Sequence, residues 1–401
     1  MHTPNPSWIA IAAGVTVALH IAKLPPAVAV LQGQLGISLV QAGFLLSTVQ
    51  VAGMLLGLLV GLGADRWGLR RSMLAGLLLI GSASILGAAA NSFVWLLALR
   101  AAEGLGLLLV AMPAPGLIRR SVPPAELPSR MGWWGAYMPL GSALGLLFGP
   151  WMIDAFHWPA WWMALGCVSL AAGLAVWAWM PPDPPDSNPA RGSDGRARLR
   201  ATVRHRGSWL AAGSFMVYSA QWVSVVGFLP TIYARAGTEP RVAGVLTALV
   251  AAVNMAGNIA AGQLLQRGWP ARRCLRSGFA LMGVCALVAF AQWNGQPAAP
   301  LWMGFAALLV FSAAGGMIPG SLFASVGQLA SSPQTVSTTV GLMQQLSSFG
   351  QFIGPPMVAG VATAVGGWQC TGLVTGALCA MGWRLAGAVH GELSKSGAAS
   401  A

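Results

Sequence analysis

Long apolar runs recur along the sequence, with short polar breaks between them. Six lie near residues 7–31, 38–62, 72–90, 93–118, 128–153 and 158–180, and six more lie near residues 208–233, 241–266, 274–293, 299–323, 335–363 and 366–388. A helix needs about 20 mostly apolar residues to cross a bilayer. The runs are continuously apolar and lack the alternating pattern of membrane β-strands. They therefore predict an all-α membrane protein with about twelve transmembrane helices.

One polar segment divides the runs into two groups of six. Its sequence, PPDPPDSNPARGSDGRARLRATVRHRG at 181–207, is rich in proline, glycine, serine and arginine, which is typical of a solvated linker. We therefore expect an amino-terminal six-helix half at 1–180, a cytoplasmic linker at 181–207 and a carboxy-terminal six-helix half at 208–401.

Short motifs recur in the same order in the two halves. The sequence Gly145-x-x-x-Gly149-Pro150 returns as Gly350-x-x-x-Gly354-Pro355, and Pro115-Gly116 returns at nearly the same offset as Pro319-Gly320. Each half has an even number of predicted spans, so both halves would insert with the same orientation, as parallel repeats do. The repeat predicts two structurally similar halves.

The composition excludes most soluble classes of protein. Of 401 residues, 56% are hydrophobic and 8% are charged, whereas soluble domains carry roughly a quarter charged residues. Disorder is excluded because it requires low hydrophobicity. The chain has five cysteines, an odd number, and they lie in or beside apolar runs. This pattern indicates buried free thiols rather than a set of disulfides. The chain has no ATP-binding P-loop sequence and no metal-ligand spacing, so we expect no enzyme, no cofactor and no metal.

The positive charge follows the predicted topology. The chain has 22 Lys and Arg residues against 9 Asp and Glu, which gives a net charge of +13. If both termini are cytoplasmic, Arg235 and Arg241 fall outside, Lys23 and Arg100 fall within the membrane, and the other basic residues are cytoplasmic. This bias predicts a multi-pass protein of the cell inner membrane and accounts for the charge without nucleic acid. The arginine-rich linker is expected to fix the topology, with binding of anionic lipid as the alternative.

A loop rich in glycine and arginine joins the second and third runs. It reads Gly61-Leu-Gly-Ala-Asp65-Arg66-Trp-Gly68-Leu-Arg70-Arg71. Glycines permit tight turns and close helix packing, and arginines hold a loop on the cytoplasmic side. The loop resembles the motif of the major facilitator superfamily at every defined position. The resemblance implies two six-helix halves around a cavity that opens to one side at a time, with a gating role for Gly61, Asp65, Arg66, Gly68, Arg70 and Arg71.

Two predicted spans of the first half carry ionisable residues. The fourth contains Arg100-x-x-x-Gly104-x-Gly106, with Glu103 about one turn from Arg100, and the first contains His20 and Lys23. Charges inside a membrane are costly and usually mark a functional site. The fourth-span sequence resembles the superfamily's second motif, whose arginine is linked to proton coupling.

The charges in these spans predict an anion site. Lys23, Arg100 and Glu103 carry a combined charge of +1, which attracts anions in a region of low dielectric constant. We predict that Lys23 and Arg100 bind the anion in a shared water-filled cavity, while Glu103 and His20 couple protons. The alternatives are an Arg100–Glu103 pair that only packs helices, a Lys23 that reaches the outer interface, and a His20 that is a hydrogen-bonded packing residue.

The predicted spans of the second half offer neutral polar residues instead. Tyr218, Gln221 and Trp222 share one face of the seventh run, Asn254 and Asn258 lie one turn apart in the eighth, and the eleventh contains Gln344, Gln345 and Gln351. Such amides can bind a solute or cross-link helices. The resemblance implies that the first, fourth, seventh and tenth spans line the cavity. The substrate-binding residues that we predict are Lys23, Arg100, Tyr218, Gln221, Trp222 and Gln344.

These residues predict a secondary active transporter. We expect a monomer in the lipid bilayer that carries a small organic or pseudohalide-like anion by alternating access, coupled to protons. Three stretches resemble the cyanate/nitroimidazole transporter-like branch, namely Lys23-Leu-Pro25-Pro26, Arg100-Ala-Ala-Glu103-Gly104 and Gly350-Gln351-x-x-Gly354-Pro355-Pro356. The alternative is a drug/proton antiporter that exports small amphipathic compounds, because Gly145-x-x-x-Gly149-Pro150 resembles the antiporter motif of the superfamily and the second half is apolar and aromatic.

Overall fold

The computed structural model describes residues 5–123, 126–183, 195–293, 296–297, 300–332 and 335–400. Within these ranges the side chains of 60–67, 127–129, 132, 293, 296–297 and 394–400 are not described. The described chain is almost entirely helical, and its two-residue strands β1 (Gln292–Trp293) and β2 (Gln296–Pro297) pair antiparallel. The predicted all-α fold class is confirmed.

The chain divides into two compact units. Unit 1 comprises Met1–Gly192 and Leu229–Ala248, and unit 2 comprises Ser193–Phe228 and Leu249–Ala401. Unit 1 thus includes the end of α11 and the start of α12, where the Arg241 guanidinium donates to Asp154 Oδ2 at 2.6 Å and lies over the Trp151 ring. The division into halves at 1–180 and 208–401, which follows the sequence repeat, stays a prediction.

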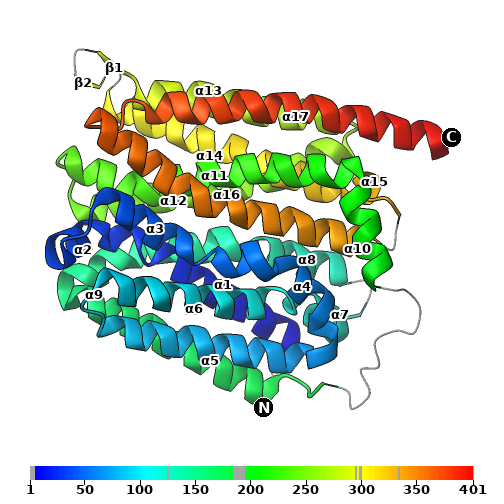
Figure 1. Ribbon diagram of the computed structural model, residues 1–401, viewed down its shortest axis with the longest axis horizontal. Coiled ribbons are helices and arrows are strands. Elements are labelled where there is room, and N and C mark those ends of the chain that lie inside the picture. The colour runs from blue at the N-terminus through cyan, green and yellow to red at the C-terminus, as the bar shows by residue number, and fades with distance from the viewer. Residues whose placement is uncertain are drawn as a thin grey trace. The chain divides into compact units, whose positions relative to one another are not determined.

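Unit 1 contains the first series of helices (Figure 1). These are α1 (Pro6–Ala22), the 3₁₀ turn η1 (Pro25–Ala27), α2 (Val28–Leu35), α3 (Leu39–Thr48), α4 (Val51–Trp67), α5 (Leu69–Ala88), α6 (Phe93–Ala111), α7 (Ala114–Ser121), α8 (Leu127–Gly135) and α9 (Tyr137–Trp179). The first predicted run is interrupted after Lys23, because Pro25 and Pro26 lack the N–H groups that would continue α1. The run therefore folds as α1, η1 and α2.

Unit 2 contains most of the second series. It is built from α10 (Gly195–Arg204), α11 (Arg206–Arg235), α12 (Pro240–Gln266), α13 (Ala271–Phe290), α14 (Leu301–Ala324), α15 (Val326–Leu329), α16 (Val336–Val365) and α17 (Thr371–Ser400), apart from the ends of α11 and α12 named above. The helix α10 lies inside the predicted linker.

The helices are consistent with the predicted spans, and the count of twelve stays a prediction. Ten helices among the described residues are long and apolar enough to cross a membrane. One of them, α9, is a 43-residue element that turns at His157, where φ is 64°, so it carries two predicted runs. The remaining run corresponds to α16, which is not among these ten helices. The chain is thus a multi-pass membrane protein.

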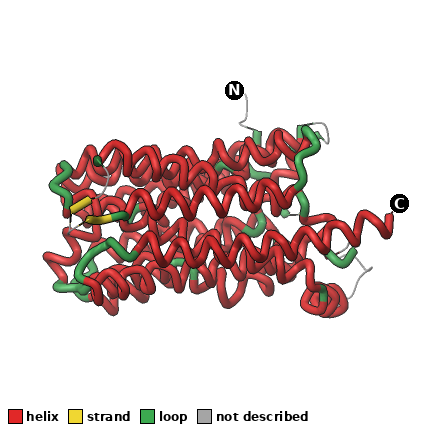
Figure 2. Tube along the Cα trace, turned by 90° about the horizontal axis from the view of Figure 1, so that it is seen from above, coloured by secondary structure: helices red, strands yellow, loops and turns green. Residues whose placement is uncertain are grey.

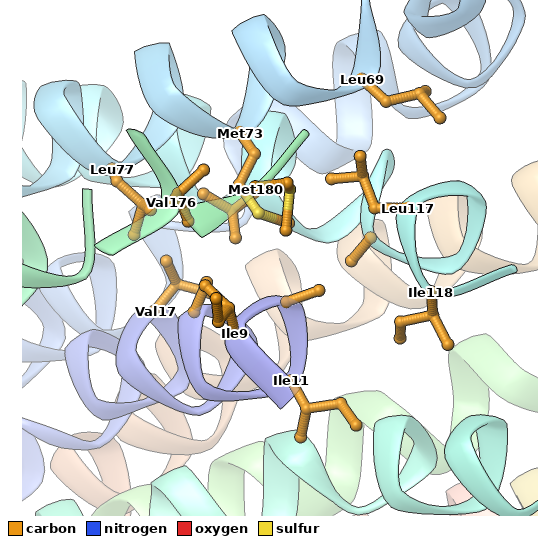
Figure 3. Close-up of a cluster of buried hydrophobic side chains, with 14 of the residues drawn as sticks. Ile9, Ile11, Val17, Leu69, Met73, Leu77, Leu117, Ile118, Val176 and Met180 are labelled. Carbon is orange, nitrogen blue, oxygen red and sulfur yellow. The ribbon is translucent and has the colours of Figure 1, made fainter. Parts of the chain in front are cut away.

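Apolar packing holds the helices of unit 1 together. Val17 of α1, Met73 of α5 and Met180 after α9 belong to one buried cluster (Figure 3). Other large apolar side chains are exposed, among them Leu174 and Trp177 on α9. An exposed apolar surface of this kind is expected where helices contact lipid.

The repeated glycine motif makes the same kind of contact in both units. In unit 1, a Cβ atom at Gly145 would come within 2.8 Å of Ala22, and in unit 2 one at Gly350 would collide with the Met216 carbonyl. The motif therefore lets α9 and α16 approach α1 and α11 closely, as glycine does between membrane helices.

Candidate functional site

Four ionisable residues of unit 1 meet in one buried group. His20 is in the last turn of α1 and Lys23 follows that helix, while Arg100 and Glu103 lie one turn apart on α6. The side chains of His20, Lys23 and Arg100 are 0% exposed and that of Glu103 is 1% exposed. We call these four residues the ion cluster.

Glu103 joins the two cations of the ion cluster. Its Oε1 accepts from Lys23 Nζ, and its Oε2 accepts from Arg100 Nη1 at 2.7 Å. The carboxylate therefore pairs each of its oxygens with a different cation. One negative charge against two positive charges leaves the group at +1 when His20 is neutral.

Lys23 has further acceptors besides Glu103. Its Nζ donates to Ser84 Oγ at 2.9 Å and lies 3.4 Å from His20 Nδ1. It is also 4.7 Å from the centre of the Trp162 ring, which stabilises a desolvated cation. The ammonium group thus has an acceptor for each of its three N–H bonds.

The contacts of His20 fix its tautomer. Lys23 can only donate, so Nδ1 of His20 is the acceptor in that pair. The proton then lies on Nε2, which donates to Ser169 Oγ at 2.7 Å, and Ser169 in turn donates to the Leu165 carbonyl. His20 is therefore neutral and helps to orient Lys23.

Arg100 ties α6 to two neighbouring helices. Its Nη1 donates to the His20 carbonyl at 2.7 Å, and its Nε donates to the Leu45 carbonyl at 3.2 Å. Its Nη2 is buried and has no hydrogen-bond partner among the residues that the structure describes. The ion cluster thus has surplus positive charge and an unused guanidinium donor.

Helical spacing predicted the Arg100–Glu103 pair on α6, and the family resemblance implied that the first and fourth spans lie side by side. The structure brings His20, Lys23, Arg100 and Glu103 into one group. The sequence also suggested a water-filled cavity around Lys23 and Arg100, but both side chains are fully enclosed by protein. Burial is tolerated because nearly every donor is paired. Sequence reasoning missed Ser84 and Ser169, since serines in apolar runs give no signal that separates a ligand from a packing residue.

Unit 2 contains a neutral counterpart, which we call the amide cluster and define as Tyr218, Trp222, Asn254, Asn258 and Ser312. Asn254 Nδ2 donates to the Tyr218 hydroxyl at 2.9 Å and to the Ser312 carbonyl at 2.8 Å. Trp222 Nε1 donates to Ser312 Oγ at 2.9 Å, and Asn258 Nδ2 lies 3.3 Å from Asn254 Oδ1. These bonds join α11, α12 and α14 without a charge.

The other predicted residues of the second half lie elsewhere. Gln221 is buried, donates to the Val217 carbonyl, and accepts from Cys379 Sγ of α17 at 3.0 Å. It therefore contacts a different helix from Tyr218 and Trp222. Gln344 lies half-buried on α16, and its role as a substrate ligand stays a prediction.

Part of the predicted gating loop is described. Gly61, Asp65 and Arg66 belong to α4. The predictions for these three residues fall outside the side chains that the structure describes. Gly68 links α4 to α5 at φ 91°, and a Cβ atom there would collide with the Asp183 carboxylate. This position therefore requires glycine.

Asp183 caps the helix that begins after Gly68. Its two carboxylate oxygens accept the backbone N–H groups of Arg70 and Arg71, each at 3.1 Å. It also lies 3.7 Å from Arg120 Nη1. An acidic side chain at a helix N-terminus satisfies unpaired N–H groups and offsets the helix dipole. Sequence reasoning did not single out Asp183.

Comparisons with known sequences point to transport proteins. A sequence model described as Major Facilitator Superfamily matches residues 210–391. The 2-nitroimidazole transporter of Escherichia coli (strain K12) is 25% identical over 336 residues, which are 82% of this chain and 81% of that protein. The human monocarboxylate transporter 11 is 27% identical over 334 residues, which are 80% of this chain and 68% of that protein.

Solved structures support the fold. A bacterial homologue of the human lysosomal transporter Spinster matches with a TM-score of 0.71, at 18% identity, over 99% of this chain and 96% of that chain. A second structure of such a homologue, in an occupied conformation, matches with a TM-score of 0.72 at 16% identity and the same coverage. At these identities the likeness shows the fold alone.

Proposed function

We propose that the chain is a transporter of the major facilitator superfamily and that it carries a small organic or pseudohalide-like anion together with a proton. The ion cluster is the anion site in this proposal. The observation that carries it is the shared carboxylate: among the described residues, the two fully buried cations Lys23 and Arg100 have only Glu103 as counter-charge.

Glu103 takes the place of the anion in the empty carrier. Its two oxygens contact the two cations in the way that the carboxylate of a substrate would. When Glu103 binds a proton, it loses its charge and releases both cations. A monovalent anion then binds Lys23 and Arg100 in its place, and the unused Nη2 of Arg100 offers a further donor.

Charge counting gives the stoichiometry. The ion cluster carries +1 with Glu103 ionised and +2 after protonation, and a monovalent anion returns it to +1. The loaded and the empty carrier then have the same charge, so moving the site across the membrane costs no extra electrical work. The cycle is therefore an electroneutral symport of one proton with one anion, by alternating access.

Within this proposal Glu103, rather than His20, binds the proton. A proton on Nδ1 of His20 would face the ammonium group of Lys23 at 3.4 Å, so two donors would oppose each other. His20 acts by orienting Lys23. The amide cluster, with Tyr218 and Trp222, contributes neutral polar and aromatic surface that favours a small partly apolar solute, and Gln221 and Gln344 stay candidate ligands.

The remaining expectations complete the proposal. Both termini are cytoplasmic, the protein acts as a monomer in the cell inner membrane, and the loop Gly61-x-x-x-Asp65-Arg66-x-Gly68-x-Arg70-Arg71 gates the cytoplasmic side. The positive charge of this loop and of the 181–207 segment supports the orientation. The Asp183 cap supports the gating role by fixing the helix that follows the loop.

The test uses the full chain in liposomes that contain a pH-sensitive dye. Adding cyanate, acetate or lactate outside should acidify the lumen faster than in protein-free liposomes. The rate should not change when valinomycin and potassium set the membrane potential. The variant Lys23→Met should stay folded and lose the flux, while the control Arg235→Gln, which removes an exposed cation, should keep it. Flux that depends on the potential contradicts the stoichiometry, and unchanged flux in Lys23→Met contradicts the anion site.

A second candidate is the export of small amphipathic drugs in exchange for protons. The E. coli relative is named for a nitroimidazole, and the amide cluster offers a neutral aromatic surface for such a compound. The human relative is named for monocarboxylates, which favours the anion. Proton efflux on addition of 2-nitroimidazole, with no response to the anions, would favour the exporter.

A further inference from the structure

The helix α10 crosses the long helices of its own unit instead of running along them. In Figure 1 it stands nearly perpendicular to α16 and α17, and in Figure 2 it is seen almost end-on. Thr202, which is 0% exposed, bonds Thr338 of α16 through their hydroxyl groups at 2.6 Å. Thr338 lies in the first turn of α16, so this bond holds α10 across the beginning of that long helix rather than along it (Figure 1).

One face of α10 combines arginines with an apolar side chain. Arg196, Arg200 and Arg204 follow at intervals of four residues, which places them along one stripe of a helix. All three are exposed, and so is Val203, which lies on the same stripe at 43% exposure. The opposite face is the one that Thr202 fixes to α16.

A tryptophan extends this face. Trp209, in the first turn of α11, is 45% exposed, and its Nε1 donates to the Val203 carbonyl at 2.7 Å. Tryptophan is enriched at the level of lipid headgroups because its ring is apolar and its N–H is polar. The bond fixes the ring beside the exposed valine.

The charge of this segment is one-sided. From Gly195 to Trp209 the sequence contains five arginines and no acidic residue. Fixing the topology requires only positive charge in a loop. It requires neither a helix, nor a stripe at four-residue intervals, nor an anchored tryptophan, and together these features form a basic, partly apolar face of the kind that lies in the headgroup region.

We propose that α10 is a docking surface for anionic phospholipid headgroups of the membrane leaflet. The arginines of the stripe bind the lipid phosphates, and Val203 and Trp209 insert between the headgroups. Lipid binding fixes α10 and, through Thr202, the first turn of α16. This inference goes beyond the proposed transport function and does not depend on it.

Amide hydrogen exchange of the full chain in nanodiscs tests the proposal. The probe lipid is phosphatidylglycerol, added to phosphatidylcholine. The amides of α10 should exchange more slowly when phosphatidylglycerol is present, while those of α13 should not change. Each arginine near an anionic surface contributes about fivefold to binding, so Arg200→Gln should reduce the protection by about that factor. The triple variant Arg196→Gln/Arg200→Gln/Arg204→Gln should lose about 100-fold.

Matched variants separate lipid docking from general charge. The variant Arg267→Gln/Arg273→Gln/Arg384→Gln removes three exposed arginines elsewhere and should keep the effect, as should Arg→Lys replacements on the stripe. Inorganic phosphate added to phosphatidylcholine nanodiscs should give no protection. The proposal is overturned if phosphatidylglycerol does not slow exchange of α10 in the native chain, if the control variant loses the effect equally, or if free phosphate reproduces it.

Discussion

In unit 1 the first, second and fourth predicted spans, which contain α1, α3 and α6, meet at the ion cluster. In unit 2 the first, second and fourth spans of the repeat, which are α11, α12 and α14, meet at the amide cluster. Arg100 on the fourth segment bonds the carbonyls of His20 on the first and Leu45 on the second. In unit 2, Asn254 on the second segment bonds Tyr218 on the first and the Ser312 carbonyl on the fourth. The repeat thus places a polar junction at the same three segments in each unit.

The difference between the junctions is their charge. The ion cluster has a surplus positive charge and a guanidinium nitrogen that finds no hydrogen-bond partner within the described part of the chain, whereas the amide cluster consists of neutral donors and acceptors. Breaking a buried ion pair costs about 3–5 kcal/mol because the remaining charge stays buried. A neutral hydrogen bond between membrane helices contributes about 0.6 kcal/mol. We infer that the ion cluster can respond strongly to a proton or an anion, and that the amide cluster mainly provides shape.

The largest expected effect comes from Glu103→Gln. The substitution leaves Lys23 and Arg100 without their counter-charge, so the free energy of unfolding should fall by about 3–5 kcal/mol. Denaturant unfolding of the purified protein in detergent measures this loss. Since the variant imitates the protonated carrier, an added small anion should restore part of the stability.

The matched control for Glu103→Gln also removes the Lys23 cation, so that the net charge of the ion cluster is the same as in the native chain. The double variant Glu103→Gln/Lys23→Met leaves one buried positive charge, as in the native cluster, and should be more stable than Glu103→Gln alone. If Glu103→Gln unfolds like the native chain, the carboxylate is not the counter-charge that holds the two cations.

A charge placed in the neutral junction is the converse experiment. Asn254→Asp puts a carboxylate beside Tyr218 and the Ser312 carbonyl, with no cation in the amide cluster. An aspartate in the middle of a membrane helix costs about 3 kcal/mol, so the variant should unfold at lower denaturant concentration. The loss should shrink at acidic pH, where the carboxyl is neutral, and Asn254→Leu should show no such dependence. If Asn254→Asp loses the same free energy of unfolding at neutral and at acidic pH, the charge is not the cause of the loss, and the amide cluster tolerates a carboxylate.

An intermediate effect is expected at Ser84, which supports the ion cluster without being charged. Ser84→Ala removes one acceptor from Lys23 and one donor from the Trp162 carbonyl. A buried group without a partner costs about 1–3 kcal/mol. The matched variant is Ser169→Ala, which removes the acceptor of His20. Denaturant unfolding compares the free energies of unfolding of the two variants. If Ser84→Ala lost less stability than Tyr218→Phe, the expectation that the charged cluster is more sensitive than the neutral one would be wrong.

Much of the fold is predictable because bilayer thickness sets the length of apolar runs. The runs at 72–90 and 299–323 correspond closely to α5 and α14. The sequence did not predict the interruption after Lys23 or the helix α10, because both depend on local geometry that apolarity does not report. In the sequence, Pro25-Pro26 lies inside a continuous apolar run, so apolarity alone does not mark it as the end of a helix.

The candidate sites were predictable only where helical spacing decides the contact. Arg100 and Glu103 lie on one helix, and their pairing follows from the interval of three residues. Spacing could not show that Ser84 and Ser169 come from other helices to meet Lys23 and His20, or that Gln221 faces Cys379 rather than the amide cluster. Asp183 follows two prolines in a polar segment, and its capping role depends on a contact more than a hundred residues away in the sequence.

The smallest expected effect is that of Tyr218→Phe in the amide cluster. It removes one hydroxyl group, but Asn254 Nδ2 keeps its bond to the Ser312 carbonyl. The expected loss is therefore about 0.6 kcal/mol, the average for such bonds between membrane helices. Denaturant unfolding beside Ser84→Ala measures it, and the proton-coupled anion flux should persist, since the variant leaves the charges of the ion cluster unchanged. A loss of several kcal/mol, or abolished flux, would mean that the neutral junction contributes to transport as strongly as the charged one does.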